Sequence, residues 1–334
     1  MEEKQNIDFE LLANDCKLFD SSDTNFTIEK INSLEDLYDK ESLIQIYNYF
    51  LTNSKSPEVL MHLIRCTDKY RDKSTLSILL DLLLMKNIDN EISAHEKEMF
   101  TNTRVLCAKA ISNYKDTSSV TPLLYCLNNK DENYKIRLAC ADALGKIGDR
   151  YAVAPLIEVV KDEEEKSVYL RESAASALGM LGDLRAVDPL VSILETQKGI
   201  WDKFTFLKER VIEALGKLRL NDNERVFNAL KNSLIDESPQ IRINAIEAIM
   251  DSENPQAEET IRTCLADKDD EVKKNALIAL YNMIGREILD EVVNEPSYPD
   301  ILKIEAVSMI EEYEEDSEEE NEYSKIRKRE DFND

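Results

Sequence analysis

Apolar residues recur every three or four positions along most of this chain, which is the spacing of one face of an α-helix. One stretch, from Arg137 to Asp149, reads RLACADALGKIGD, and a close copy, RESAASALGMLGD, runs from Arg171 to Asp183. Looser copies also begin at basic residues, which stand at 104, 137, 171, 208, 242, 273 and 303, in steps of 33, 34, 37, 34, 31 and 30 residues. This self-similarity predicts a repeat architecture in which each unit buries its apolar face on its neighbours.

Each repeat is predicted to contain two helices. The second helix begins near the basic residue and carries small and aliphatic side chains at helical spacing. The first helix follows an aspartate and has proline in its opening turn, as in AVAPLIEVV after Asp149 and AVDPLVSIL after Asp183. Aspartate accepts hydrogen bonds from the free N–H groups of a helix start, where proline has no N–H to leave unpaired. Gly148 and Gly182 mark the ends of second helices. No segment alternates as a strand does, so the fold class is all-α.

A second periodic feature is expected to connect the repeats. In three units an aspartate stands six residues before the basic residue, across the short turn that joins the two helices. In a stack, such groups would form a ladder of hydrogen bonds from one repeat to the next, with anion binding as the alternative role of the basic residues. The residues that we assign to this structural ladder are Asp131, Arg137, Arg171, Asp236, Arg242, Asp267 and Lys273.

The A-L-G-x-[IL]-G-D ending followed by A-V-x-P-L resembles the HEAT-like repeat of the phycobilisome-lyase type, over about 100–310. The resemblance implies an armadillo-type fold, a right-handed α-solenoid. Upstream segments such as PEVLMHLIRC and STLSILLDLLL have helical spacing and suggest two degenerate helix pairs. We therefore expect about eight HEAT-like helix pairs over 41–313 and an N-terminal arm or cap at 1–40. Residues 314–334, first acidic and then basic, are expected to form a disordered tail.

Composition narrows the function classes. The chain has 42 Lys and Arg against 68 Asp and Glu, a formal net charge of −26. This charge disfavours nucleic acid and anionic membranes as main partners and favours a basic one. The sequence begins MEEKQNIDFE, without the basic and apolar regions of a signal peptide, and no apolar run approaches the ~18 residues of a spanning helix. A cytoplasmic protein is expected.

Candidate chemistry is sparse. The six cysteines are scattered, without C-x-x-C, and buried free thiols are expected, above all at Cys107 and Cys140. His62 and His95 are the only histidines, so a His-rich metal site is excluded and a Ser-His-Asp triad would have to use one of them. Iron hydroxylases of this repeat fold use several His-Glu pairs, whereas this chain has only His95-Glu96. We assign no catalytic residue, metal or cofactor.

Candidate contact residues follow from the repeat register. The positions five residues after each basic residue are expected to face the concave side of the solenoid, and there they are Asp142, Ser176, Glu213 and Glu247. Such a groove is neutral to acidic and would repel DNA, unlike that of DNA glycosylases built from HEAT-like repeats. The 37-residue step inserts ETQKGIWDKFTF, with the single tryptophan, Trp201. Trp201 is expected either to plug the base of the next helix or to serve as an interface anchor.

We therefore expect a non-enzymatic scaffold or adaptor that binds another protein, basic or helical, along its concave face. The alternative, implied by the resemblance, is a chaperone-like subunit of a bilin lyase that acts on a phycobiliprotein, which would need an apolar or aromatic groove. A third hypothesis is a regulatory subunit whose acidic tail competes for its own groove.

Overall fold

The structure is a computed structural model, and it describes residues 7–20, 23–85, 93–195, 205–218 and 223–312. The chain divides into two compact units, Met1–Ala186 (unit 1) and Val187–Asp334 (unit 2). Every regular element among the described residues is a helix, and none is a strand.

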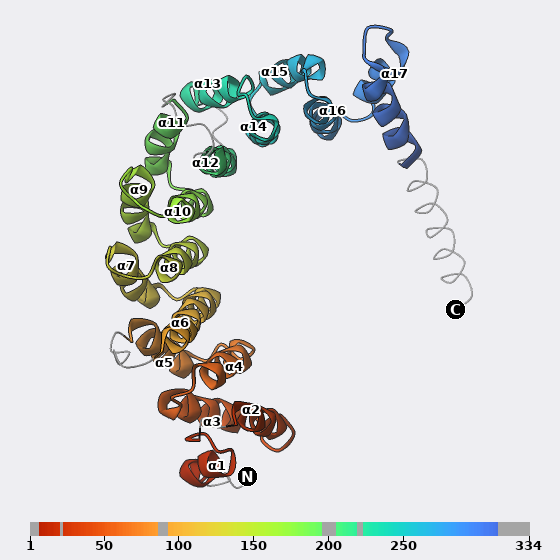
Figure 1. Ribbon diagram of the computed structural model, residues 1–334. Helices are drawn as coiled ribbons and strands as arrows, with labels where there is room; N and C mark the ends of the chain where they lie inside the picture. The colour runs from red at the N-terminus through yellow and green to blue at the C-terminus, as the bar shows by residue number, and fades with distance from the viewer. Residues whose placement is uncertain (1–6, 21–22, 86–92, 196–204, 219–222, 313–334) are drawn as a thin grey trace, which may run out of the picture. The chain divides into compact units, whose positions relative to one another are not determined.

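Unit 1 is a stack of helix pairs (Figure 1). The first helices of the pairs are α3 (Lys40–Asn53), α5 (Lys73–Leu84), α7 (Val120–Asn128) and α9 (Val153–Lys161). The second helices are α4 (Pro57–Asp68), α6 (Ala94–Tyr114), α8 (Tyr134–Ile147) and α10 (Val168–Leu181). Two helices precede them, α1 (Phe9–Asp15) and α2 (Thr24–Ser33), and α2 packs against α4. Short 3-10 turns are η1 (Leu34–Asp36), η2 (Thr117–Ser119), η3 (Arg150–Ala152) and η4 (Leu184–Ala186).

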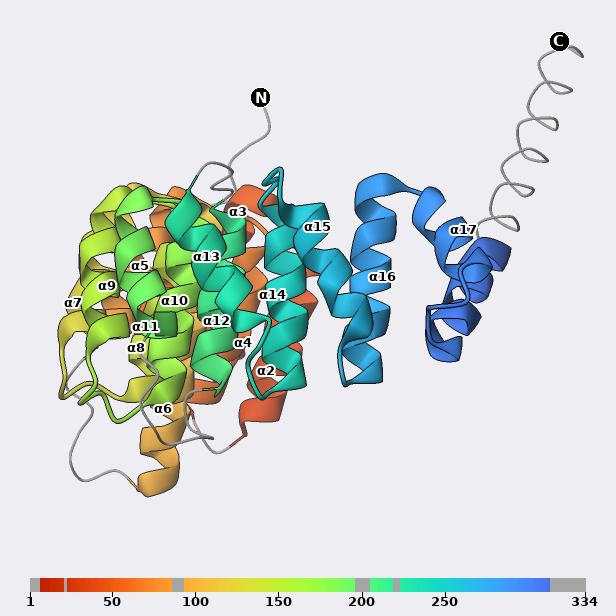
Figure 2. The ribbon, with the colours of Figure 1, turned by 90° about the horizontal axis from the view of Figure 1, so that it is seen from above.

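Unit 2 continues the same alternation. Its first helices are α11 (Val187–Glu195), α13 (Glu224–Ser233), α15 (Ala257–Arg262), which runs into the 3-10 turn η5 (Thr263–Ala266), and α17 (Glu287–Asn294). Its second helices are α12 (Thr205–Lys217), α14 (Pro239–Asp251), α16 (Asp270–Ile284) and a last helical stretch over 300–312. The second helices α4, α6, α8 and α10 of unit 1 pack in sequence on one another, as do α12, α14 and α16 of unit 2, and Figure 2 shows α12 and α14 side by side.

The ends of the helices follow the predicted signals. Asp149 accepts a hydrogen bond from the Tyr151 N–H (2.9 Å) at the start of η3, the 3-10 turn that leads into α9. Asp183 accepts one from the Arg185 N–H in the equivalent turn (3.0 Å). Gly148 and Gly182 cap α8 and α10 with φ of 83° and 65°, a left-handed conformation that glycine adopts without the steric cost of a Cβ atom. The helix boundaries predicted from the sequence at these positions are confirmed.

Small residues let the second helices approach closely. A Cβ atom placed on Gly145 of α8 would lie 2.8 Å from Cα of Ala177 in α10, inside van der Waals contact. Gly216 of α12 faces Ala248 of α14 in the same way, at 3.0 Å. Aliphatic side chains fill the remaining space, and Leu144 is fully buried. All six cysteines are buried and free, as expected.

The all-α solenoid of repeated helix pairs is confirmed. Counted from α3, the described residues form eight helix pairs. The segment 1–40, expected as an N-terminal arm or cap, contains α1 and α2. The tail, 314–334, lies outside the described residues. Among the helices that are described, none combines the length and the apolar character needed to cross a membrane.

Candidate functional site

Four of the basic residues that open the repeats are arginines, and each of them closes the turn of its own helix pair. In unit 1, Nε of Arg104, Arg137 and Arg171 donates to the carbonyls of Leu83, Leu127 and Val160, at 2.7, 2.9 and 2.9 Å. These carbonyls lie in the last turn of α5, α7 and α9, where backbone oxygens have no partner within the helix. The three guanidinium groups therefore cap the first helices, and burial lowers the pKa of Arg171.

The rest of the guanidinium reaches the next repeat. Arg104 pairs with both carboxylate oxygens of Glu132 (3.1 and 2.6 Å), and Nη1 of Arg137 pairs with Glu165 (2.7 Å). Each acidic partner stands 28 residues after its arginine, in the turn of the following helix pair. Both pairs are almost fully buried. The ladder in unit 1 thus connects one turn to the next.

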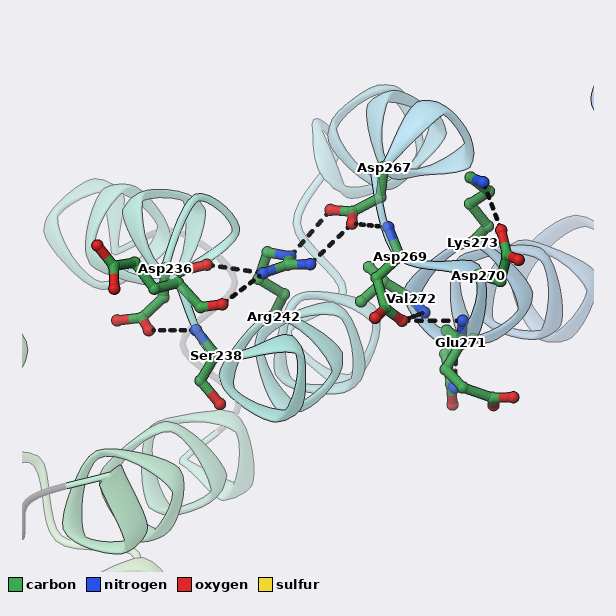
Figure 3. Close-up of polar contacts among 11 residues, drawn as sticks. Asp236, Ser238, Arg242, Asp267, Asp269, Asp270, Glu271, Val272 and Lys273 are labelled. Atoms are coloured by element: carbon green, nitrogen blue, oxygen red, sulfur yellow. Dashed lines mark hydrogen bonds and ion pairs between the residues drawn. The ribbon is translucent and has the colours of Figure 1, made fainter. Parts of the chain in front are cut away.

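Unit 2 has the same arrangement, drawn in Figure 3. Nη1 of Arg242 donates to the carbonyls of Asp236 and Glu237 in its own turn, at 2.8 and 3.2 Å. Its Nε and Nη2 bind Asp267 of the next turn at 2.9 and 2.8 Å, a bidentate pair. One step earlier, the carboxylate of Asp236 pairs with Lys208 at 3.1 Å.

Two assigned ladder residues lie differently from the prediction. Asp131 is exposed, and the paired carboxylate of that turn belongs to Glu132, one residue later. Lys273 pairs within its own helix with Asp270 (2.6 Å), and position 301, 28 residues on, is an isoleucine. Sequence reasoning missed Glu132 and Glu165, although a search for acids at a constant distance after each arginine would have found them.

The second helices also present one exposed stripe each. The stripe is defined by counting back from the aspartate that precedes the first helix of the following pair. Residues three, seven, eleven and fourteen positions before this aspartate lie on one face of the second helix, because steps of three or four residues return to the same side. In unit 1 the stripe comprises Glu58, Met61, Arg65 and Lys69 on α4, Asn102, Val105, Lys109 and Asn113 on α6, Lys135, Leu138, Asp142 and Lys146 on α8, and Tyr169, Glu172, Ser176 and Met180 on α10. None of these residues is buried.

In unit 2 the repeat register gives the equivalent residues. They are Phe206, Glu209, Glu213 and Lys217 on α12, Gln240, Ile243, Glu247 and Asp251 on α14, Glu271, Lys274, Ile278 and Asn282 on α16, and Ile301, Ile304, Ser308 and Glu312 on the last helix. All of them are likewise half-buried or exposed.

The two stripes differ in charge. The unit 1 stripe has five cationic side chains and three carboxylates, a net charge of +2, whereas the unit 2 stripe has six carboxylates and two lysines, a net charge of −4. The expected neutral to acidic face therefore holds for unit 2 and is wrong for unit 1. The expectation rested on one position in each of the helices α8, α10, α12 and α14. The cations of unit 1 lie mostly on α4 and α6, or one turn away from that position on α8.

The four predicted contact residues all lie on these stripes. Asp142 accepts a hydrogen bond from the hydroxyl of Ser173 on the neighbouring helix, and Ser176 is half-buried. Glu213 forms ion pairs with Arg210 and Lys217, at 2.8 and 2.7 Å. Trp201 lies outside the described residues, as do positions 196–204 of the insertion that carries it.

Electrostatics separate the two glutamates. Partial burial opposes ionisation of Glu213, but its hydrogen bonds from Lys217 and Arg210 outweigh this and lower its pKa. Partial burial raises the pKa of Glu247, and the nearby charges of Asp251 and Glu213 raise it further. The charge of Glu247 is therefore the one that lacks compensation.

The histidines do not form a catalytic arrangement with the groups that they contact. Nε2 of His62 lies 2.8 Å from Oδ1 of Asn32 and 3.5 Å from Sγ of Cys66. A nitrogen that donates to the amide oxygen has no lone pair left to accept the thiol proton, and burial raises the pKa of Cys66. Glu96, next to His95, binds the backbone N–H and the hydroxyl of Ser93 in a capping box. No group of three metal-ligating side chains occurs in the described parts of the chain.

Two solved structures share the fold with TM-scores above 0.5. A Kap95p structure with RanGDP superposes with a TM-score of 0.57 at 13% identity, covering 89% of this chain and 47% of that one. Importin beta gives 0.52 at 16% identity, covering 85% and 44%. The complex of CpcE and CpcF of phycocyanin lyase from a Nostoc species gives 0.44 at 22% identity, covering 71% and 87%. The chain thus spans less than half the length of the two transport proteins.

Comparison by sequence gives the family. No curated protein matches the chain. The model of HEAT repeats matches residues 88–168, 122–201 and 227–310, which together make up more than half of the chain. These matches cover α6, α8 and α10, which carry the capping arginines of unit 1, and α14 and α16 of unit 2, whereas α4 and α12 lie outside them. The protein belongs to the HEAT-repeat family.

Proposed function

We propose that this protein is a non-enzymatic scaffold whose unit 2 stripe binds a basic, amphipathic helix of a partner protein. The observation that carries the proposal is the composition of that stripe, which combines exposed apolar side chains with carboxylates that form no ion pair to a described residue. Glu209, Glu247, Asp251 and Glu271 make no ion pair with any described residue.

The exposed apolar side chains of the unit 2 stripe are the second feature that the partner must match. Phe206 is 61% exposed, Ile278 38% and Ile304 66%. Burying a large apolar side chain contributes about 1.5–3 kcal/mol, and a partner that lacked apolar residues would leave these three in water. A helix with lysine or arginine on one face and aliphatic residues on another satisfies both requirements.

The dimensions of the stripe suit a helix of moderate length. Neighbouring packed helices lie about 8–10 Å apart, so the four second helices of unit 2 span roughly 30 Å. A partner helix rises about 1.5 Å per residue and would cover this distance with about 20 residues. The partner's charges would also meet Glu247, whose pKa is raised by partial burial and, further, by the nearby charges of Asp251 and Glu213.

The test is a binding titration of the full chain. The probe is a fluorescein-labelled 20-residue helical peptide with lysine on one face and leucine on the other, followed by anisotropy at low and high salt. In the test variant, Glu247→Gln and Asp251→Asn remove two stripe charges. We expect about a tenfold loss of affinity, or ~1.4 kcal/mol, at low salt and a smaller loss at high salt.

The matched control removes two exposed carboxylates elsewhere in unit 2. Glu224 on α13 and Glu259 on α15 are exposed and lie on first helices, so Glu224→Gln with Glu259→Gln changes the net charge equally. An equal loss in both variants would mean that the peptide senses only the overall negative charge, and the proposal would fail. A peptide with glutamine in place of lysine should bind weakly to every form.

The bilin lyase subunit remains a prediction and has its own test. Co-expression with a phycobiliprotein and its bilin would give a red-absorbing product under that hypothesis, whereas a scaffold would give none. The third hypothesis, competition by the acidic tail, predicts tighter peptide binding by a chain that ends at residue 312.

A further inference from the structure

The stripe of unit 1 carries exposed cations that have no counter-ion among the described residues, in a chain whose net charge is −26. Arg65 on α4, Lys109 on α6 and Lys146 on α8 are exposed. None of the three forms an ion pair or a side-chain hydrogen bond within the part of the chain that the structure describes. Other cations of the stripe are compensated, since Lys69 pairs with Glu35 (2.7 Å) and Lys135 with Glu98 (3.2 Å).

The repeat register places these cations on adjacent helices. Arg65 and Lys109 each stand seven residues before the aspartate that starts the next first helix, so they occupy the same position on α4 and α6, which pack together. Lys146 stands one turn further along α8, the next helix in the stack. The three charges therefore lie on three consecutive second helices of the stack.

An apolar row accompanies the cations. Met61, Val105 and Leu138 stand one turn before Arg65, Lys109 and Asp142 on the same three helices, and all three are half-buried. Cationic and apolar positions thus run in parallel over α4, α6 and α8. This combination is the reverse in charge of the unit 2 stripe and fits a different partner.

We propose that the unit 1 stripe binds an acidic amphipathic segment of a partner protein, with its carboxylates on Arg65, Lys109 and Lys146 and its apolar side chains on the Met61, Val105 and Leu138 row. Charge complementarity sets the choice of partner. A nucleic acid is less suited, because Asp142 and Glu172 interrupt the cations of the stripe and the chain as a whole repels a polyanion. The proposal uses unit 1 alone and does not depend on the outcome for unit 2.

The test uses the full chain and a fluorescein-labelled 16-residue helical peptide with glutamate on one face and leucine on the other. The stripe variant combines Lys109→Glu with Lys146→Glu. The control variant combines Lys161→Glu with Lys231→Glu, which reverses two exposed lysines in the last turns of first helices α9 and α13. Both variants change the net charge equally, and circular dichroism verifies that both remain helical.

We expect the wild-type chain to bind the acidic peptide, the stripe variant to bind at least tenfold more weakly, and the control variant to stay within about twofold of wild type. Equal weakening in both variants, or no binding by wild type at 50 mM salt, overturns the proposal. Binding of a 16-nucleotide single strand or of phosphatidylserine vesicles as tightly as the peptide also overturns it, in favour of a general polyanion surface. The peptide could also bind only after residues 313–334 are removed. This result would mean that the chain's own acidic run occupies the stripe, in the same or another copy, and would overturn the proposal that a partner protein binds there.

Discussion

Replacing Arg242 with methionine is expected to destabilise the repeats on both sides of it. Methionine keeps most of the apolar stem but removes a guanidinium that makes four hydrogen bonds, two to Asp267 and two to backbone carbonyls. The side chain of Arg242 is 2% exposed and that of Asp267 is 12% exposed. Water therefore compensates little for the loss of the guanidinium. Breaking a buried ion pair by removing one partner costs about 3–5 kcal/mol, and we expect a loss in this range.

The assay has to allow for the repeat architecture, because stacked repeats can open in parts. Hydrogen exchange followed by mass spectrometry reports the opening of each helix separately. A loss of about 3 kcal/mol corresponds to exchange roughly 100-fold faster for the amides of α14 and α16, if they exchange by local opening. Urea unfolding by circular dichroism supplies the global value.

The matched control is Arg225→Met. Arg225 also binds two carboxylates, those of Asp188 and Glu195, but the three side chains are about half or more exposed. Exposed pairs contribute about 0–1 kcal/mol, so this substitution should change little. Similar effects of Arg242→Met and Arg225→Met would refute the reasoning. The double variant Arg242→Met with Asp267→Leu should lose less than Arg242→Met alone, because no buried carboxylate then remains unpaired.

The pH dependence gives an independent check. Burial opposes ionisation of Asp267, but its hydrogen bonds from Arg242 and from the Asp269 N–H lower its pKa overall. Because the pKa of Asp267 is lower in the folded protein than the ordinary aspartate value of ~3.9, its ionised carboxylate stabilises the folded state above about pH 3.9. This stabilisation is lost as the pH falls through the folded-state pKa. The difference in stability between wild type and Arg242→Met should therefore shrink below about pH 4. A constant difference down to pH 2.5 would contradict this assignment.

Three further predictions follow from particular residues. Gly145→Ala should destabilise by about 1–2 kcal/mol in urea unfolding, because its Cβ would overlap Ala177, even though alanine favours helices; unchanged stability would mean that α8 and α10 can separate at no cost. As the pH falls, binding of the basic peptide should begin to weaken before the pH reaches the ordinary glutamate pKa of ~4.3, because the raised pKa of Glu247 means that its carboxylate is protonated at a higher pH. Glu247→Gln should remove this component of the pH dependence. Cys107, whose pKa burial raises to about 12, should react with Ellman's reagent only after unfolding, and labelling of the native protein at this cysteine would contradict its burial.

The local features of this protein were determined by its sequence. Helices, their aspartate starts and their glycine ends depend on a few neighbouring residues, so RLACADALGKIGD and its copies specify them directly. The burial of Leu144 and the close approach at Gly145 follow from the same pattern, because a repeat can only cover its apolar face with the next copy.

The pairing between repeats and the charge of the stripes were decided only by the tertiary structure. Which acid meets Arg137 depends on the rotation and rise from one helix pair to the next, and this geometry selects Glu165, 28 residues away, over Asp131, which is closer in sequence. The exposed faces likewise collect residues from four helices, so the cations of unit 1 and the carboxylates of unit 2 become separate surfaces only when the helices stack. Composition adds these charges into one number, −26, whereas packing separates them in space.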